Sequence, residues 1–298
     1  MLPGVWSSLD HVIVAVRDLD LATGRTARLL GRRPSWCGSN PALGTGNALF
    51  RLANTTLELL APVAAGELAK RLEERLDRLG EGLAGLAFAT EDADAAAALL
   101  RARGLEAAGP QKGLGRDDES GAWREWRTLA LPGSATRGVW LCGIQHLSPP
   151  EVLPPSTPIG VERAAVAGLD HVVVASPDLE GARRLYGDLL GLRLALDRSF
   201  EARGLRMLFF RVGGVTLEVV GRLGAPPHAA APDRLDGLAW RTPDVDAARA
   251  RLAAAAFDVS EVRTGFKPGT RVCTVRDGTC GVPTLLIGPD PAATEPVR

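Results

Sequence analysis

Two histidines and two glutamates that recur at one spacing are the residues of this sequence best suited to chemistry. His11 precedes Glu58 by 47 residues. The same interval separates His171 from Glu218. Each glutamate interrupts an apolar run, where a carboxylate is costly unless a cation, a hydrogen-bond donor or water meets it. A histidine on a neighbouring strand would add a neutral nitrogen, so each pair amounts to half of a divalent metal site. The spacing therefore predicts metal binding, and the alternative is a pair that only forms hydrogen bonds.

The segments that carry these residues belong to a longer internal repeat. Residues 9–20 read LDHVIVAVRDLD, and residues 169–180 read LDHVVVASPDLE, at an offset of 160 positions. A weaker copy of the pattern follows in each half, and there Gly85 and Gly237 occupy the position of the histidine. Because the histidine and glutamate segments keep one offset, the chain contains a duplicated half. The weaker copy within each half raises the number of related units to four.

Each unit has the pattern of a strand, a helix and three further strands. The runs HVIVAV and HVVVAS are β-branched strand material. Asp18 and Asp178 follow them, where a carboxylate can accept hydrogen bonds from the free N–H groups of a first helical turn. Helical spacing of Leu and Ala then ends at a glycine, before three strand-like stretches. The four predicted modules cover about 9–62, 82–147, 169–222 and 235–289.

The length of 298 residues suits two domains of roughly 150 residues each. The segment SPPEVLPPSTPIG contains five prolines, which exclude a helix or a central strand. We therefore predict a first domain at 1–147, a Pro-rich linker at 148–164 and a second domain at 165–298.

The composition argues against several classes of protein. The 35 basic and 35 acidic side chains balance, unlike those of a nucleic-acid binder held by bulk charge. No apolar run reaches the 18 residues of a membrane span, and the N-terminus lacks a signal pattern. The four cysteines form no C-x-x-C pair, which favours a reduced, cytoplasmic protein. The abundance of Ala, Leu and Arg indicates a GC-rich genome, and we expect a bacterial protein. We expect a small-molecule partner, no nucleic acid, no membrane, and a monomer or homodimer.

The motif LDHVxVAxxDL, a helix, an apolar pair of strands and a closing xxLELx strand together resemble the vicinal oxygen chelate superfamily. That family includes glyoxalase I, the extradiol dioxygenases, methylmalonyl-CoA epimerase, and the fosfomycin- and bleomycin-resistance proteins. The resemblance covers nearly the whole chain. It implies an α+β fold in which four βαβββ modules form two glyoxalase-like domains, with curved mixed sheets that form cups. The residues on the family's metal-ligand positions are His11, Glu58, His171 and Glu218.

The second and fourth units depart from the family pattern. Gly85 and Gly237 replace the histidine, and the final strands at 139–144 and 283–288 carry no glutamate. If consecutive units pair, which is the commoner arrangement in the family, each cup holds one histidine and one glutamate. That set has fewer ligands than the two histidines and two glutamates of a glyoxalase site. It also has fewer than the two histidines and one glutamate of an extradiol dioxygenase iron site. If the first unit pairs with the third, all four ligands would meet in one cup.

The resemblance implies a divalent-metal-dependent lyase or isomerase that acts on a small oxygenated substrate through an enediolate-type intermediate. Glu58 or Glu218 would be the catalytic base, and zinc, nickel, manganese or iron would suit the ligands. The alternative is a metal-free protein of the bleomycin-resistance type that binds an antibiotic or metabolite. An extradiol dioxygenase is less favoured, because Gly237 stands where a second histidine is expected.

Arg51 and Arg211 each precede a glutamate by seven positions. Either arginine could hold a substrate carboxylate through two parallel hydrogen bonds, and the alternative is an outward, solvated side chain. Several tryptophans could line an apolar cup or belong to a core: Trp36, Trp123, Trp126, Trp140 and Trp240.

Overall fold

The computed structural model describes residues 5–226, 228 and 231–293. The elements of the first half are β1 (Ser8–Ala15), α1 (Leu19–Leu30), β2 (Trp36–Asn40), β3 (Thr45–Arg51), β4 (Thr56–Pro62), α2 (Glu67–Leu79), β5 (Gly82–Ala89), α3 (Ala93–Ala102), β6 (Gln111–Asp117), β7 (Trp123–Ala130) and β8 (Trp140–His146). Two short helical turns follow, η1 (Pro150–Val152) and η2 (Glu162–Ala164). The elements of the second half are β9 (Gly168–Ala175), α4 (Leu179–Arg183), the π-helical turn η3 (Arg184–Leu189), β10 (Arg193–Phe200), η4 (Glu201–Arg203), β11 (Leu205–Val212), β12 (Val215–Arg222), β13 (Arg234–Arg241), α5 (Val245–Ala254), β14 (Arg263–Thr264), β15 (Thr270–Val275), β16 (Thr284–Pro289) and η5 (Pro291–Ala293).

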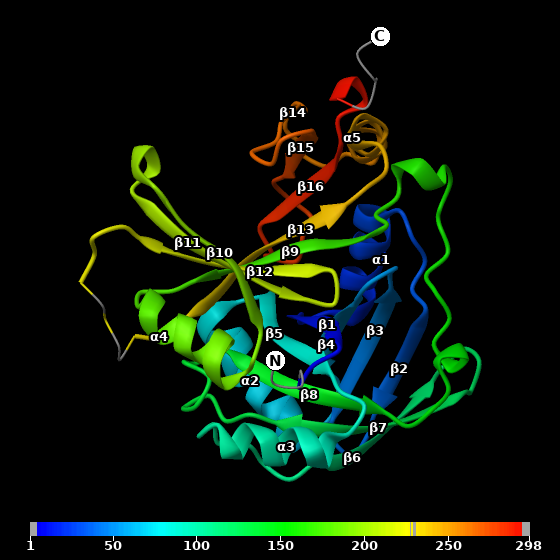
Figure 1. Ribbon diagram of the computed structural model, residues 1–298. Coiled ribbons are helices and arrows are strands. Elements are labelled where there is room, and N and C mark those ends of the chain that lie inside the picture. Colours follow the sequence, from blue (N-terminus) through cyan, green and yellow to red (C-terminus); the bar gives the residue numbers. More distant parts are fainter. Residues whose placement is uncertain (1–4, 227, 229–230, 294–298) are drawn as a thin grey trace.

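These elements form four successive modules of a strand, a helix and three strands, with α2 between the first two modules. The strands of the first half form a closed barrel in the order β1-β4-β3-β2-β6-β7-β8-β5 (Figure 1). Those of the second half form an open sheet in the order β10-β11-β12-β9-β13-β16-β15-β14. Both sheets mix parallel and antiparallel pairs. The predicted α+β fold of four βαβββ modules is therefore confirmed.

Consecutive modules pair within each sheet. Strand β1 runs antiparallel to β5 in the barrel, and β9 runs antiparallel to β13 in the open sheet. His11 and His171 therefore belong to different sheets, and the arrangement in which all four predicted ligands share one cup does not occur.

An aspartate begins one helix in each module by accepting from free backbone N–H groups of the first turn. The four N-cap residues are Asp18, Asp92, Asp178 and Asp244. Helix α1 ends at Gly31, whose left-handed backbone suits a glycine. The third module departs from the predicted α-helix, because α4 continues as the π-turn η3 with Tyr186 fully buried. None of the helices in the described residues is long and apolar enough to cross a membrane.

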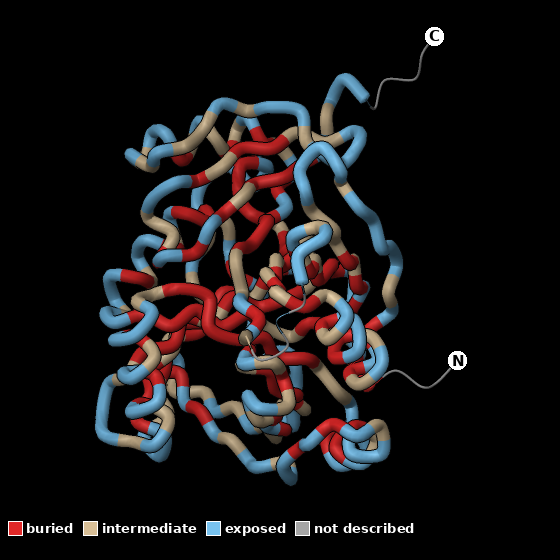
Figure 2. The backbone as a smooth tube through the Cα atoms, turned by 90° about the vertical axis from the view of Figure 1, so that its left-hand side faces the viewer, coloured by how far each residue is buried: buried red, intermediate tan, exposed pale blue. Residues whose placement is uncertain are grey.

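The main core lies between the outer face of the barrel and one face of the open sheet. Val14 and Leu59 of the barrel meet Leu238 and Trp240 of the second half there. Figure 2 shows buried segments through the middle of the molecule and exposed segments around it. Because side chains alternate along a strand, the opposite faces point away from this core. The polar residues of interest lie on those opposite faces.

Candidate functional site

His11 and Glu58 meet inside the barrel of the first half. Strand β1 runs parallel to β4, with His11 opposite Thr56 and Ile13 opposite Glu58. This register puts the histidine and the glutamate on the inner face, with His11 Nε2 3.3 Å from Glu58 Oε2. Their side chains are only 14% and 13% exposed, so the contact is shielded from bulk water.

Asp10 joins two histidines at the same place. The register of β1 and β5 shifts between Leu9 and His11. Asp10 Oδ1 lies 2.7 Å from His11 Nδ1, and Asp10 Oδ2 lies 2.8 Å from His146 Nε2 at the end of β8. Burial raises the pKa of Asp10, but the two histidines outweigh it and hold that pKa well below its ordinary value. Burial likewise lowers the pKa of His11, but Asp10 and Glu58 outweigh it and raise that pKa.

Asn47 fixes the other oxygen of the glutamate. It lies on β3 beside β4, and its Nδ2 donates to Glu58 Oε1 over 2.8 Å. One carboxylate oxygen is thus held by an amide while the other faces His11. This arrangement fixes the orientation of Glu58 before any ligand enters.

Arg124 on β7 lies over two indole rings on the inner face of the barrel. Its guanidinium carbon is 5.4 Å from the Trp36 ring centroid and 6.0 Å from that of Trp126. Glycines on β6 make room for this layer, because a Cβ at Gly113 would lie 2.3 Å from Trp126 Nε1. A Cβ at Gly115 would approach both indoles. The tryptophans predicted for a cup thus include two that line this barrel.

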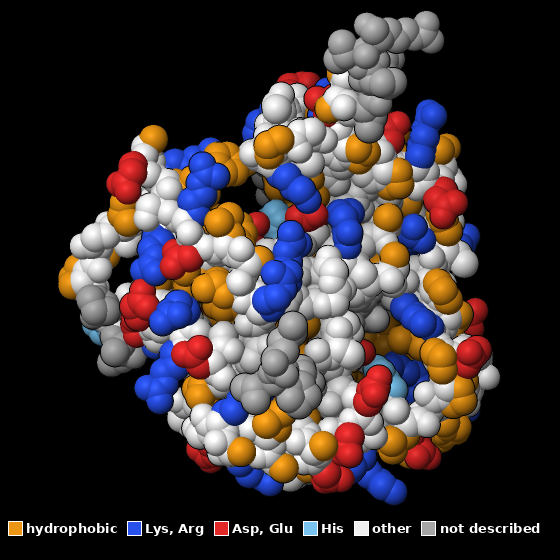
Figure 3. Space-filling model, viewed as in Figure 1, with side chains coloured by type: hydrophobic (Ala, Val, Ile, Leu, Met, Phe, Trp, Pro, Cys, Tyr) orange, Lys and Arg blue, Asp and Glu red, His pale blue; other side chains and the backbone are white. Residues whose placement is uncertain are grey.

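The segment after β8 crosses one end of the barrel. Leu153 packs against Trp36 and Leu49 there. Arg51 Nη1 donates to the backbone oxygen of Pro150 over 2.7 Å and also to that of Leu153. Figure 3 shows a hollow over this barrel at the lower right, where histidine, acidic and basic side chains gather. The hollow gives solvent a route to the inner face.

The second half repeats the histidine, aspartate and glutamate with less support around them. His171 Nδ1 lies 2.9 Å from Asp170 Oδ1 and 3.7 Å from Glu218 Oε1. Met207 occupies the place that Asn47 has in the first half. Burial raises the pKa of Glu218 more than the charges of His171 and Arg211 lower it. The second site therefore has no amide counterpart of Asn47.

The residues present do not complete a metal site. The strand register places Gly85 and Cys142 where a second histidine and glutamate would stand in the barrel. Gly237 and Leu285 occupy those places in the open sheet. In the described part of the chain, no group of three or more His, Cys, Asp or Glu side chains is arranged to hold a metal ion. Each predicted ligand pair thus falls short of the three protein ligands of ordinary catalytic zinc sites, so the donor sets do not fit a resident metal.

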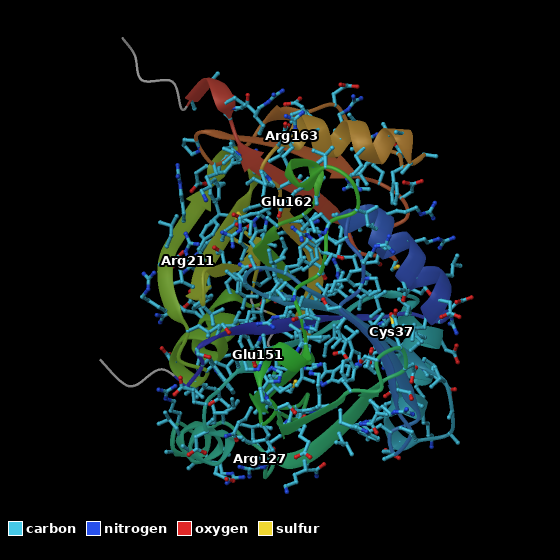
Figure 4. The ribbon with its side chains drawn as sticks, turned by 90° about the vertical axis from the view of Figure 1, so that its right-hand side faces the viewer. Cys37, Arg127, Glu151, Glu162, Arg163 and Arg211 are labelled. Atoms are coloured by element: carbon cyan, nitrogen blue, oxygen red, sulfur yellow. The ribbon has the colours of Figure 1, made fainter. Side chains whose placement is uncertain are left out.

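The two predicted substrate-binding arginines make local hydrogen bonds. Arg51 holds the segment after β8, as described, and Arg211 Nη1 donates to Thr216 Oγ1 over 2.7 Å within its own hairpin. Figure 4 shows Arg211 on β11 and Cys37 on β2 at opposite sides of the molecule. Substrate binding by Arg51 and Arg211 stays a prediction.

Sequence reasoning missed four residues of the first site: Asp10, Asn47, Arg124 and His146. Asp10 left a signal, because an aspartate precedes the histidine in both copies of the repeat. His146 ends the last strand of the second module, beside the prolines, and its local sequence carries no sign of a contact with Asp10. Asn47 and Arg124 reach the site through strand pairings that connect distant segments.

Two family models match the sequence. The model described as a glyoxalase-like domain matches residues 9–167. The model described as the glyoxalase/bleomycin resistance protein/dioxygenase superfamily matches residues 170–274. A search of curated proteins finds no match.

Two solved structures that match nearly the whole chain share its fold. A triple mutant of 4-hydroxymandelate synthase from Streptomyces coelicolor gives a TM-score of 0.68 at 18% identity, over 96% of this chain and 93% of that one. A hypothetical protein from Staphylococcus aureus gives 0.62 at 11% identity, over 93% and 98%. Methylmalonyl-CoA epimerase from Mycobacterium tuberculosis gives 0.36 at 26% identity, over 43% and 91%. The first two comparisons support the architecture. The chemistry has to be inferred from the residues of the site.

Proposed function

This chain belongs to the glyoxalase/bleomycin resistance protein/dioxygenase superfamily, the vicinal oxygen chelate proteins, as two glyoxalase-like domains in tandem, and we propose that its first barrel is the active site of a lyase or isomerase for a small oxygenated substrate. The observation that carries this proposal is the shielded 3.3 Å contact between His11 and Glu58, with Asp10 behind the histidine. A metal-dependent version would need donors beyond the pair that each half offers.

Glu58 is the proposed base. A proton on a carbon next to a substrate carbonyl moves to Glu58 Oε2, and the electron pair of the broken C–H bond moves toward the carbonyl oxygen. His11, held at Nδ1 by Asp10, donates from Nε2 to that oxygen and lowers the cost of its developing charge. In an isomerase acting on a 2-hydroxy carbonyl compound, His11 protonates the former carbonyl oxygen and takes the proton of the neighbouring hydroxyl group, which becomes the new carbonyl, while Glu58 returns its proton to the former carbonyl carbon. In a lyase, the electron pair instead returns from the oxygen to form a carbon–carbon double bond, and a group leaves from the carbon beyond the deprotonated one with its bonding electron pair and the proton from Glu58.

Hydrogen exchange in D₂O tests the proposal without knowledge of the natural substrate. The full chain is incubated with small 2-oxo and 2-hydroxy carboxylates and aldehydes, and proton NMR follows loss of the signal next to the carbonyl or hydroxyl. We expect Glu58→Gln to slow exchange by about 100-fold or more, as removal of a general base does. Glu218→Gln is the matched control in the second half and should leave exchange intact.

Three results would count against the proposal. If no probe exchanges its hydrogen, the enzymatic function is refuted. If E58Q and wild-type protein exchange at equal rates, Glu58 is not the base. Exchange that stops with a chelator and returns with one divalent ion would restore the metal-dependent hypothesis. Exchange that persists with the chelator supports the metal-free mechanism.

A binding protein is the second candidate, and one observation in the second half favours it. Glu218 lies opposite Phe209 and near Met207, without an amide donor from the neighbouring strand, in an apolar setting that suits retention of a ligand. Stoichiometric binding without exchange, lost in His171→Ala and kept in His11→Ala, would support this function over the enzyme.

A further inference from the structure

Arg124 is charged, partly buried and without a hydrogen-bond acceptor among the described residues. It contacts two indole rings, is attracted at longer range by Asp10 and Glu58, and is repelled by Arg51. A cation taken out of water is costly unless an anion or a set of acceptors meets it. The aromatic rings offset part of that cost, but they leave the N–H groups of the guanidinium without an acceptor in the part of the chain that the structure describes.

The charged groups nearest Arg124, which are Asp10, Glu58 and Arg51, already have partners. Asp10 binds two histidines, and Glu58 receives the Asn47 amide. Arg51 donates to two backbone oxygens. Cys142 adds no charge near neutral pH, because burial, with Glu58 and Asp10 nearby, raises its pKa to about 12. Arg124 is therefore the guanidinium of this site that remains open to a ligand.

The position of Arg124 is built into the strands around it. Gly113 and Gly115 leave the space that Trp126 fills, and a Cβ at Gly38 would lie 2.7 Å from Trp36 Nε1. Side chains at these three positions would displace the indoles on which the guanidinium lies. The open sheet has Leu196 at the place of Trp36, so the second half lacks this arrangement.

We infer that the substrate of the first barrel carries a carboxylate, which Arg124 binds while the adjacent carbon lies toward His11 and Glu58. A guanidinium presents a planar fork that matches the two oxygens of a carboxylate, and the indoles provide an apolar surface for the carbon skeleton. The inference rests on the proposed function of this barrel and narrows its substrates to small carboxylic acids.

Binding of matched charged and neutral probes tests the inference. Saturation-transfer NMR titrations of the full chain compare pyruvate, 2-oxobutanoate and lactate with their methyl esters. We expect the carboxylates to bind at least about tenfold more tightly than the esters, since charge-assisted paired hydrogen bonds are lost in the ester. Arg124→Gln should abolish this preference, and Arg124→Lys should keep a part of it because the charge remains without the fork.

The control variant lies on the same strand and points outward. Arg127 Nη1 pairs with Asp94 Oδ2 at 2.7 Å on the outside of the barrel, so Arg127→Gln should keep the preference for carboxylates. Equal binding of acids and esters by the wild-type protein, or an unchanged preference in R124Q with a native circular dichroism spectrum, would overturn the inference. Tighter binding of inorganic phosphate than of every carboxylate would overturn the assignment to carboxylates.

The same titrations separate this inference from the proposed function. Glu58→Gln should still prefer carboxylates while it loses hydrogen exchange. Carboxylate preference through Arg124 without exchange in wild-type protein would defeat the enzymatic proposal alone. Exchange of esters and acids at equal rates in wild-type protein and R124Q would defeat the inference alone.

Discussion

Asn47 and Met207 occupy corresponding places beside the glutamate strands of the two halves. Asn47 donates an amide hydrogen to Glu58, whereas a methionine side chain has no N–H or O–H group to offer Glu218. The pKa of Glu218 is raised by burial, in keeping with this more apolar setting. A single side chain thus distinguishes a fixed carboxylate from one that lacks an amide donor.

The substitution Asn47→Met places in the first half the residue that the second half has at the corresponding position, Met207. We expect this variant to lose about 1–3 kcal/mol of unfolding free energy, because Glu58 Oε1 loses its donor inside the barrel. Urea unfolding at pH 7, followed by circular dichroism, measures the change. Met207→Asn is the converse control and should destabilise less, because it places a donor near Glu218. An unchanged urea midpoint for N47M would show that the amide contributes nothing to stability.

The contact between His11 and Glu58 could be expected from the sequence, and its surroundings could not. The repeated interval of 47 residues placed both side chains on neighbouring strands of one module. Asp10, in contrast, faces His146 from 136 residues away, across pairings of the whole barrel. Arg124 is one of many arginines in the chain, and only the register of β6, β7 and β8 shows which face it occupies. The pairing of strands that are far apart in the sequence cannot be recognised from the spacing of residues within one segment.

At the scale of elements, the four modules follow from local pattern, but the closure of one sheet does not. Repeated strand and helix patterns specify each module by themselves. The barrel closes because β2 pairs with β6, with Gly38 opposite Asp117. In the second half the edge strands are β10 and β14, and β14 has only two residues, Arg263–Thr264. A strand this short offers few backbone groups for closure, so the second sheet stays open.

The segment after β8 also acquires its place through tertiary contacts. Its prolines predicted a linker between domains, and part of it lies across the first barrel. Ser156 N donates to the Arg51 backbone oxygen over 2.9 Å, and Ser156 Oγ lies 3.0 Å from Ser35 Oγ. These bonds join the segment to β3 and to the turn before β2. Access to the inner face of the barrel therefore depends on how firmly this segment is held.

Arg51→Ala should loosen that segment. Glu151 in η1 is exposed, and a glutamate-specific protease would cut after it once the segment opens (Figure 4). We expect cleavage at this bond to be at least about tenfold faster in R51A, because charge-assisted bonds to Pro150 and Leu153 are lost and cleavage follows the population of the open form. Mass spectrometry of the 1–151 fragment measures the rate. The counterpart variant in the second half, Arg211→Ala, should be cleaved after Glu151 at the wild-type rate. Equal acceleration of cleavage in both variants would contradict a local role for Arg51.

At the scale of the whole molecule, the two halves share a core and a buried ion network. Arg137, in the connection between β7 and β8, reaches two aspartates of the second half. Its Nε lies 3.1 Å from Asp233 Oδ1, and its Nη1 lies 3.2 Å from Asp178 Oδ2. The Asp233 side chain is fully buried, and Asp178 is the N-cap of α4. Together with the apolar contacts around Trp240, this network couples the halves, so we expect one cooperative unfolding transition.

Arg137→Gln should destabilise both halves in that single transition, and the loss should grow with pH. Burial raises the folded-state pKa of Asp233 even with Arg137 present, and loss of Arg137 raises it further, so Asp233 holds its proton more tightly in the folded variant than in the folded wild-type protein. A folded-state pKa above the unfolded value makes stability fall as pH rises through that range. We expect a loss of about 3–5 kcal/mol at pH 8, as for a broken buried ion pair, and a smaller loss at pH 5. Urea unfolding at both pH values measures the loss of unfolding free energy.

The control variant Arg234→Gln, which removes an exposed partner of Asp236, should lose less than about 1 kcal/mol of unfolding free energy. Two separate transitions, or a loss for R137Q that is equal at pH 5 and pH 8, would contradict the coupling of the halves through a buried, ionised Asp233.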